Sequence, residues 1–268
     1  MKLLAIESSG MSAGCAYLED GRLISEYYMN SRLTHSVTLL PMVSEMQKTA
    51  GFELKDLDAI AVSAGPGSFT GLRIGAAAAK GLGLALEIPI VGVSSLKAMA
   101  FNVPAPGVLL CPLMDARRGQ VYAAAYVYAE EENNLNAILP DEALSIDAYL
   151  EKIAAVLSEK EMQAVFLGDG VPVHKEKIRE KLGEKAFFAP TTVNRQRASS
   201  VAVLGAEEFA RGSFVSADDF VPEYLRRPLA ETSKEDGTLE DAGVHSLKKI
   251  SRGDFKRTRY PEQPGKET

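Results

Sequence analysis

The stretch SAGPGSFTGLRIGAAAAKGLGLAL, from Ser63 to Leu86, restricts the fold more than any other part of the chain. It predicts a glycine-rich turn followed by a helix from Thr70 to Leu86, whose small and apolar residues cover the whole circumference. Only Arg73 and Lys80 carry charge in this helix. A surface helix normally has one apolar stripe, so a helix of this composition must be covered on more than one side. The chain's own sheet can supply one cover.

Small residues recur every four positions along this helix, at Gly71, Gly75, Ala79 and Gly83. This spacing predicts a groove in which a second helix approaches closely. Each helical glycine costs about 1 kcal/mol relative to alanine, so several of them indicate a close packing contact. The pattern leaves open whether that contact lies within the chain or with a partner.

The turn before the helix has some features of a phosphate-binding turn. Gly65 and Gly67 flank a proline, and Ser68 follows. The turn lacks the GK[ST] of a P-loop and the spacing of a dinucleotide fingerprint. Glycines still permit close backbone approach, and the free N–H groups at a helix start favour an anion. The alternative is a tight strand-to-helix turn with nothing bound.

Two distant segments share one layout. KLLAIESSGMSAGCAYLED and GVLLCPLMDARRGQVYAAAYVYAEE both run from an apolar strand through an acidic turn to a second strand. Glu7 and Asp115 occupy the corresponding turns. The repeat predicts two related α/β lobes, residues 1–103 and 104–230. Asp20 and Gly21 predict a tight hairpin turn.

Helices are expected at 34–51, 96–102, 145–160 and 199–212. The first has Leu39, Leu40, Val43 and Met46 on one side, and Pro41 either kinks it or marks its start. Serines are expected to cap the other three: Ser94 or Ser95, Ser145, and Ser199 or Ser200.

The composition excludes several classes of function. A net charge of -6 and a pI near 5.3 argue against a chain that grips nucleic acid broadly, although a subunit of an RNA-modifying complex stays open. Cys15 and Cys111 lie in apolar runs, which predicts buried thiols. With no secretory signal and no long apolar run, the cytoplasm is expected and a membrane is not.

Residues 231–268 are rich in charge, Gly and Pro, and we expect a disordered tail. Its last part is basic, and a weak contact with RNA phosphates is the alternative to a solvated tail. The three histidines, His35, His174 and His245, form no metal-binding pair. Glu7 and Asp115 could hold a phosphate and a metal, but a lone carboxylate in a turn is more often a structural acceptor.

The segments LLAIESS, HSVTLLPMV, LDAIAVSAGPGSFTGLRIGAAAAKGL, IPIVGVSSLKAMA, MDARRGQVYAAAY and YLRRPLAE together resemble the TsaB (YeaZ) family, from Met1 to about Glu231. The resemblance implies an α/β fold of two duplicated lobes, the actin-like and Hsp70-like ATPase fold (ASKHA, ribonuclease H-like). It also implies a non-catalytic accessory role in making threonylcarbamoyladenosine on tRNA.

The family is similar to a catalytic paralogue, TsaD, which carries a metal-binding HxxxH after a strand resembling IPIVGV. Here Ser95 and Met99 stand at those positions, and these side chains cannot replace two imidazoles for a catalytic metal. The phosphate turns have also changed, since Glu7 and Asp169 place negative charge there. The resemblance therefore implies a vestigial phosphate site, expected at Glu7, Ser8, Ser9, Gly65, Gly67, Ser68, Asp115, Gly168 and Gly170, and no metal or cofactor on this chain.

The resemblance further implies pairing with TsaD through helices of the first lobes. The ATPase TsaE is the expected third partner, ATP and metal are expected on the partner subunits, and tRNA is reached only through the complex. A homodimer is the alternative when the chain is alone. The expected contact residues are Leu39, Val43, Met46, Gly71, Ile74, Gly75, Ala78, Ala79 and Leu82.

Two enzymatic readings stay open. One is an ATP-dependent transferase or sugar-kinase-like enzyme that uses Glu7 and Asp115 with magnesium. The other is a metallopeptidase, for which the sequence offers no ligand set.

Overall fold

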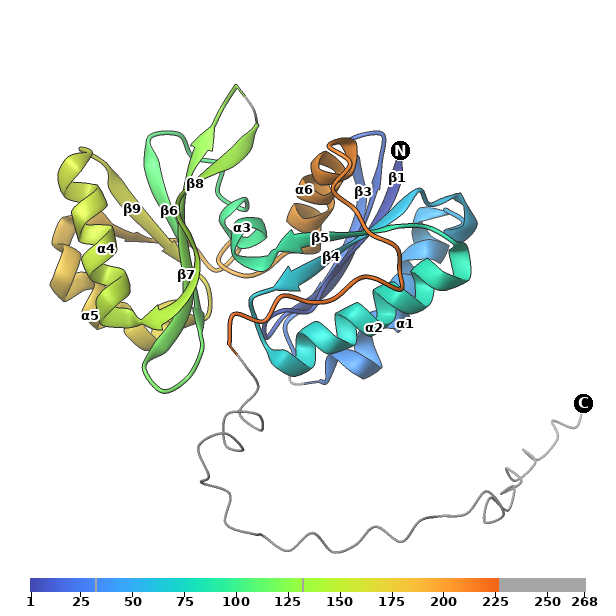
Figure 1. Cartoon of the computed structure of the whole chain (residues 1–268), viewed down its shortest axis with the longest axis horizontal. Helices are drawn as coiled ribbons and strands as arrows, with labels where there is room; N and C mark the ends of the chain where they lie inside the picture. The colour runs from blue at the N-terminus through green and yellow to red at the C-terminus, as the bar shows by residue number, and fades with distance from the viewer. Residues whose placement is uncertain (32, 132, 227–268) are drawn as a thin grey trace, which may run out of the picture. The chain divides into compact units, whose positions relative to one another are not determined.

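The computed structural model describes residues 1–31, 33–131 and 133–226 of the 268-residue chain. Its strands form two five-stranded sheets (Figure 1). The predicted tail, residues 231–268, lies outside the described residues. No helix among these residues has both the length and the apolar composition needed to span a membrane.

The first sheet has the order β3-β2-β1-β4-β5. β2 pairs antiparallel with β1 and β3, whereas β4 runs parallel to β1 and β5 runs parallel to β4. Asp20 and Gly21 have φ values of 48° and 78°, as a tight hairpin turn requires, which confirms the predicted hairpin. The strands are β1 (Lys2–Glu7), β2 (Ala13–Glu19), β3 (Arg22–Met29), β4 (Ala59–Gly65) and β5 (Ile90–Ser94).

The second sheet repeats this topology with the order β10-β9-β6-β7-β8. Again three strands pair antiparallel in sequence, and two more follow in parallel on the other side of the first. The predicted internal duplication is confirmed. The strands are β6 (Val108–Asp115), β7 (Gln120–Ala129), β8 (Asn134–Ser145), β9 (Gln163–Leu167) and β10 (Ala186–Phe188).

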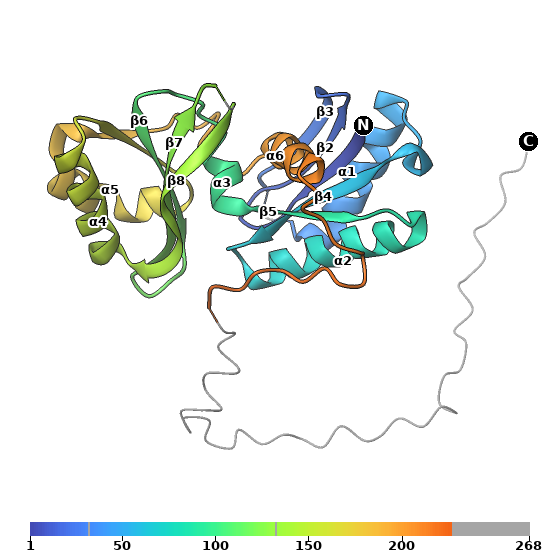
Figure 2. The ribbon, with the colours of Figure 1, turned by 45° about the horizontal axis from the view of Figure 1, so that its top comes forward.

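Helices cover both faces of the first sheet, as Figure 2 shows for α2 and α6. Alternate residues of β1 point to opposite faces, so Leu4 and Ile6 pack with α1 (His35–Ala50) and α2 (Phe69–Leu86). Leu3 and Ala5 pack with α6 (Ala198–Ala210). The short η1 helix (Leu54–Asp56) leads from α1 into β4.

The second sheet is covered in the same way. α4 (Ile146–Glu159) and α5 (Gly170–Leu182) pack on one face with Val121, Ala123 and Phe166. On the other face, α3 (Ser95–Ala100) buries Leu96 and Met99 against Leu110 and Ala124. The η2 helix (Gly183–Lys185) leads into β10.

The predicted second lobe, residues 104–230, is wrong at its end. α6 packs on β1, β2, β4 and β5, so it belongs to the first lobe. After α6 the chain stays there: Val215 pairs with Ile90, and the Glu223 N–H donates to the Ala64 carbonyl over 2.7 Å. Lys80 on α2 donates to the carbonyls of Asp218 and Phe220, both over 3.0 Å. The chain itself thus supplies a second cover for α2.

The predicted serine caps are confirmed at two helices and wrong at a third. Ser94 Oγ accepts the Lys97 N–H, and Ser145 Oγ accepts the Ala148 N–H. The N-cap residue of α6 is Arg197 and not Ser199 or Ser200. The two serine hydroxyls instead donate to Glu26 and to Asn102.

Pro41 lies inside α1 and does not begin it. The predicted burial of both thiols is confirmed, since Cys15 and Cys111 are buried and unpaired.

Candidate functional site

The two turns predicted to bind a phosphate in the first lobe, one after β1 and one before α2, pack directly against each other. The Ser68 N–H donates to the Ser9 carbonyl over 2.7 Å, and Ser8 Oγ donates to the Gly71 carbonyl over 2.9 Å. A Cβ atom at Gly67 would lie 2.3 Å from the Ser9 carbonyl oxygen, and one at Gly71 would lie 2.1 Å from that of Ser8. The glycines therefore admit another turn of the same chain, and their close approach is explained without a ligand.

Glu7 places a buried carboxyl group at this pair of turns. Its side chain is fully buried, and Oε1 accepts both the N–H and the hydroxyl of Ser9 over 2.6 Å. The Ser8 N–H is directed at Ser63 Oγ over 3.3 Å. Burial raises the pKa of Glu7, and the hydrogen bonds from Ser9 oppose this rise. The main-chain N–H groups of Ser8, Ser9 and Ser68, which a phosphate in these turns could use, are thus already engaged.

The corresponding turns of the second lobe are tied in a similar way. Asp169 Oδ1 accepts the Asp115 N–H over 3.1 Å, and Asp115 Oδ1 accepts the Arg117 N–H over 2.9 Å. Burial raises the pKa of Asp169. Gly168 and Gly170, on either side of Asp169, lie against Leu113. The predicted site residues are therefore brought together within each lobe, where they bind one another.

The described residues contain no group of three or more His, Cys, Asp or Glu side chains placed to hold a metal ion. Ser95 and Met99, at the positions compared with the paralogue's histidines, are both fully buried. His35 Nε2 lies 2.9 Å from the Gly10 carbonyl oxygen. The absence of metal from this chain stays a prediction.

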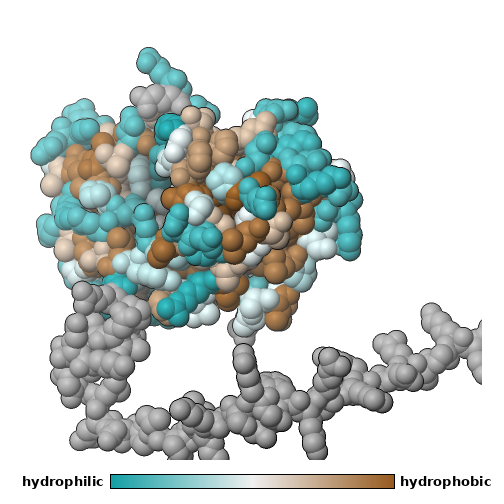
Figure 3. Space-filling view, turned by 45° about the vertical axis from the view of Figure 1, so that its right-hand side comes forward, coloured by the Kyte–Doolittle hydropathy of each residue, from teal (hydrophilic) through white to brown (hydrophobic). Residues whose placement is uncertain are grey.

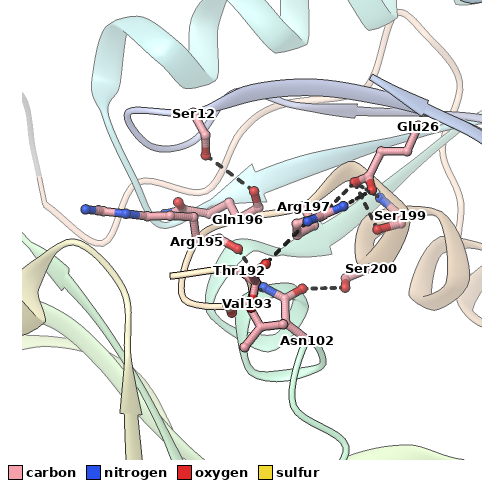
Figure 4. Close-up of polar contacts among 10 residues, drawn as sticks. All are labelled: Ser12, Glu26, Asn102, Thr192, Val193, Arg195, Gln196, Arg197, Ser199 and Ser200. Atoms are coloured by element: carbon pink, nitrogen blue, oxygen red, sulfur yellow. Dashed lines mark hydrogen bonds and ion pairs between the residues drawn. The ribbon is translucent and has the colours of Figure 1, made fainter. Parts of the chain in front are cut away.

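A second network, which the sequence did not predict, joins the two lobes (Figure 4). Asn102, just after α3, donates through Nδ2 to the carbonyls of Val193 and Arg195 over 3.1 and 2.6 Å. Its Oδ1 accepts the hydroxyl of Ser200 on α6 over 2.7 Å. Both connections between the lobes are thereby tied to one side chain.

Glu26 on β3 completes this network by pairing with Arg197 and accepting the N–H of Ser199 over 3.0 Å. An open groove of about 410 Å³ runs beside these residues, with Phe101 and Val203 in its lining. The Asn102 and Arg197 side chains in its lining are already hydrogen-bonded within the chain. We therefore interpret the groove as the edge of the contact between the lobes and not as a ligand site. No short motif marks Asn102 or Glu26, so the sequence alone does not indicate their role.

Most of the residues predicted to contact a partner are covered by the chain itself, and that prediction is wrong for them. On α1, Leu39, Val43 and Met46 are 1%, 3% and 0% exposed. On α2, Gly71, Gly75 and Ala79 are buried. A Cβ atom at Gly75 would lie 2.2 Å from Ser8 Oγ, so the predicted groove faces the chain's own β1 turn.

The partly buried Ile74, Ala78 and Leu82 pack against the same core. None of the nine predicted contact residues is more than partly exposed.

A different set of residues on these two helices faces solvent. On α1, Val37 and Leu40 are 60% and 50% exposed, and Leu84 on α2 is 52% exposed. Ala77, Gly81 and Ala85 are also exposed and repeat every four residues, and a Cβ atom at Gly81 would meet nothing within 4 Å.

We call these six residues the α1–α2 surface: Val37, Leu40, Ala77, Gly81, Leu84 and Ala85. Figure 3 brings the side of the molecule with the first sheet forward and shows hydrophobic patches among its polar residues. The helices were predicted correctly, but the small-residue stripe that faces outward is the other one.

Comparisons with known proteins decide the family. Residues 29–234 match the family model described as TsaD, tRNA N6-adenosine threonylcarbamoyltransferase. The chain is 37% identical over 231 residues to the tRNA threonylcarbamoyladenosine biosynthesis protein TsaB of Bacillus subtilis, which covers 86% of this chain and 96% of that protein. The chain belongs to the TsaB family. The TsaB protein of Escherichia coli is 30% identical over 237 residues, with the same two coverages.

Solved structures agree with the TsaB assignment. YeaZ from Pseudomonas aeruginosa superposes with a TM-score of 0.67 at 28% identity, covering 84% of this chain and 99% of that one. A second structure from that organism, an uncharacterized protein with similarity to peptidase YeaZ, gives a TM-score of 0.71 with the same identity and coverages. The predicted α/β fold of two duplicated lobes is the fold of this TsaB-family chain, a protein of threonylcarbamoyladenosine biosynthesis.

Proposed function

We propose that this chain is a non-catalytic subunit that binds TsaD through the α1–α2 surface and supports transfer of the threonylcarbamoyl group to the adenosine next to the tRNA anticodon. The observation that carries the proposal is the exposed apolar side chains of two adjacent helices, Val37 and Leu40 on α1 and Leu84 on α2. Burying such side chains on association is favourable by roughly 25 cal/mol per Å² of apolar area. TsaE docks on the resulting pair, and ATP and metal reside on the partner subunits.

The closed phosphate turns support the non-catalytic part of the proposal. A transferase or kinase-like enzyme would use Glu7 and Asp115 to hold magnesium and phosphate. In this chain Glu7 Oε1 is bonded to Ser9, and Asp115 Oδ1 is bonded to the Arg117 N–H. Opening the Glu7 turn for a nucleotide would break its hydrogen bonds and leave buried groups without partners, at about 1–3 kcal/mol for each group.

Binding of TsaD to a Leu40→Asp variant tests the proposal. Leu40 is half exposed, so the variant should fold, but a carboxylate buried in the contact without a partner costs several kcal/mol. At 1.4 kcal/mol per tenfold, calorimetry should show affinity at least about 100-fold weaker. Phe187→Asp on β10, an exposed apolar residue of the second lobe, is the matched control and should bind as the unmodified chain does.

If Leu40→Asp binds TsaD with unchanged affinity, the α1–α2 surface is not the contact. Equal weakening by Phe187→Asp would place the contact elsewhere or show a general effect of added charge. Dimerisation of the isolated chain that Leu40→Asp abolishes would show that this surface also pairs with a second copy.

A further inference from the structure

Arginines gather around the turn between β6 and β7. Arg117 and Arg118 lie in this turn, and Arg226 Nη1 donates to the carbonyl of Ala116 over 2.8 Å. Arg195 comes from the connection between β10 and α6, and its positive charge acts on the carboxylate of Asp169. Asp169 in turn accepts the N–H of Asp115 at the end of β6. We call Arg117, Arg118, Arg195 and Arg226 the arginine cluster.

The turn presents its two arginines in an unusual backbone conformation. Arg117 and Arg118 have φ values of 67° and 55°, in the left-handed region that residues with a Cβ atom seldom adopt. Both side chains are exposed. Residues held in such conformations concentrate at functional sites, because the surrounding structure must offset the strain.

The cluster carries more positive charge than its own carboxylates can balance. Asp115 and Asp169 are acidic groups beside it, and each already accepts a main-chain N–H. Among the described residues, Arg117 makes one ion pair, and it is long, with Nη1 3.8 Å from Asp115 Oδ2. Within the part of the chain that the structure describes, the guanidinium groups of Arg118 and Arg195 have no hydrogen-bond or ion-pair partner, and Arg195 extends away from the contacts drawn in Figure 4.

These features fit a phosphate ligand. Guanidinium groups bind phosphate oxygens through paired, charge-assisted hydrogen bonds. On a chain with a net charge of -6, a local group of four arginines makes a local positive potential. The TsaB family serves a reaction on tRNA, whose backbone offers phosphates in series.

We propose that the arginine cluster binds backbone phosphates of the tRNA. This replaces the expectation that tRNA is reached only through the partner subunits. The proposal uses a surface of the second lobe and does not depend on the α1–α2 surface.

The test compares two triple variants of the full chain. The cluster variant is Arg117→Asn, Arg118→Asn and Arg195→Gln, in which asparagine tolerates the left-handed turn. The control removes three exposed cations elsewhere, Arg22→Ala, Lys55→Ala and Lys160→Ala, for the same change in net charge. Fluorescence anisotropy with a labelled tRNA transcript is measured at 50 and 200 mM salt, for each chain alone and with TsaD added, and thermal melting checks the fold.

Three phosphate contacts should weaken binding roughly 20- to 40-fold between 50 and 200 mM salt. The cluster variant should lose most of this dependence and bind at least about 10-fold more weakly at 50 mM, whereas the control should retain it. The proposal is overturned if the cluster variant binds tRNA like the control, or if neither chain nor mixture binds tRNA. Displacement of tRNA by micromolar ATP would assign the cluster to a free nucleotide and overturn it as well.

Discussion

Two glycines on one helix should respond to the same substitution in opposite directions. Gly71 and Gly81 both lie on α2. Gly81→Ala adds a methyl group in open space and should stabilise the protein by about 1 kcal/mol through helix propensity. For a domain of this size the melting temperature should rise by about 2–4 °C.

Gly71→Ala receives the same propensity gain but meets backbone. Its Cβ atom would lie 2.1 Å from the Ser8 carbonyl oxygen, so α2 must move away from the turn after β1. That movement strains the hydrogen bonds from Ser68 to Ser9 and from Ser8 to Gly71, each worth about 0.5–1.5 kcal/mol, and adds about 1–3 kcal/mol of overpacking. After subtracting the propensity gain, we expect a net loss of about 1–5 kcal/mol.

Thermal melting followed by circular dichroism measures both variants. Gly71→Ala should melt about 2–20 °C below the unmodified chain, and Gly81→Ala slightly above it. Equal shifts in one direction would refute the inward orientation of Gly71 and, with it, the correction of the predicted small-residue groove.

Two further predictions concern buried titratable groups. Because burial raises the pKa of Glu7, the folded state holds this proton more tightly than the unfolded state, so Glu7 lowers the free energy of unfolding as the pH rises from its unfolded pKa through its folded pKa. Glu7→Gln removes this pH-dependent loss. In urea unfolding, the free energy of unfolding of the variant relative to the unmodified chain should therefore be more favourable at pH 8 than at pH 5. The same difference at both pH values would contradict the burial of a charged form. Burial raises the pKa of Cys15 and of Cys111 to about 12. Neither thiol should react with a disulfide reagent at pH 8 until the protein is unfolded, and rapid reaction of the native chain would show that one of them is accessible.

The helices and strands of this fold could be predicted from the sequence more accurately than which side of each helix is buried. Strand, acidic turn and strand recur in both halves, and the caps at Ser94 and Ser145 are local hydrogen bonds, so short-range chemistry was enough to find them. On α2, however, Gly71 and Gly81 belong to two stripes of the same period and similar composition. Which stripe turns inward depends on the turn that follows β1, about sixty residues earlier.

Contacts across long sequence separations account for the remaining differences. The return of Val215 to pair with Ile90 places the end of the second repeat on the first lobe, and no local pattern encodes that pairing. The capping of α6 by Glu26, 173 residues from Ser199, likewise depends on tertiary packing. For the candidate site, the sequence was enough to predict that Glu7 and Asp115 occupy corresponding turns of the two lobes. Their internal hydrogen bonds could be seen only in the structure.

Hydrogen exchange tests, without any substitution, the proposal that this chain binds TsaD through α1 and α2. Amide exchange of the full chain is followed by mass spectrometry with and without TsaD, peptide by peptide. The proposal predicts slower exchange on complex formation in peptides from α1 and α2, with α4 and α5 unchanged. Protection confined to α4, α5 or the second sheet, with α1 and α2 unaffected, would contradict it.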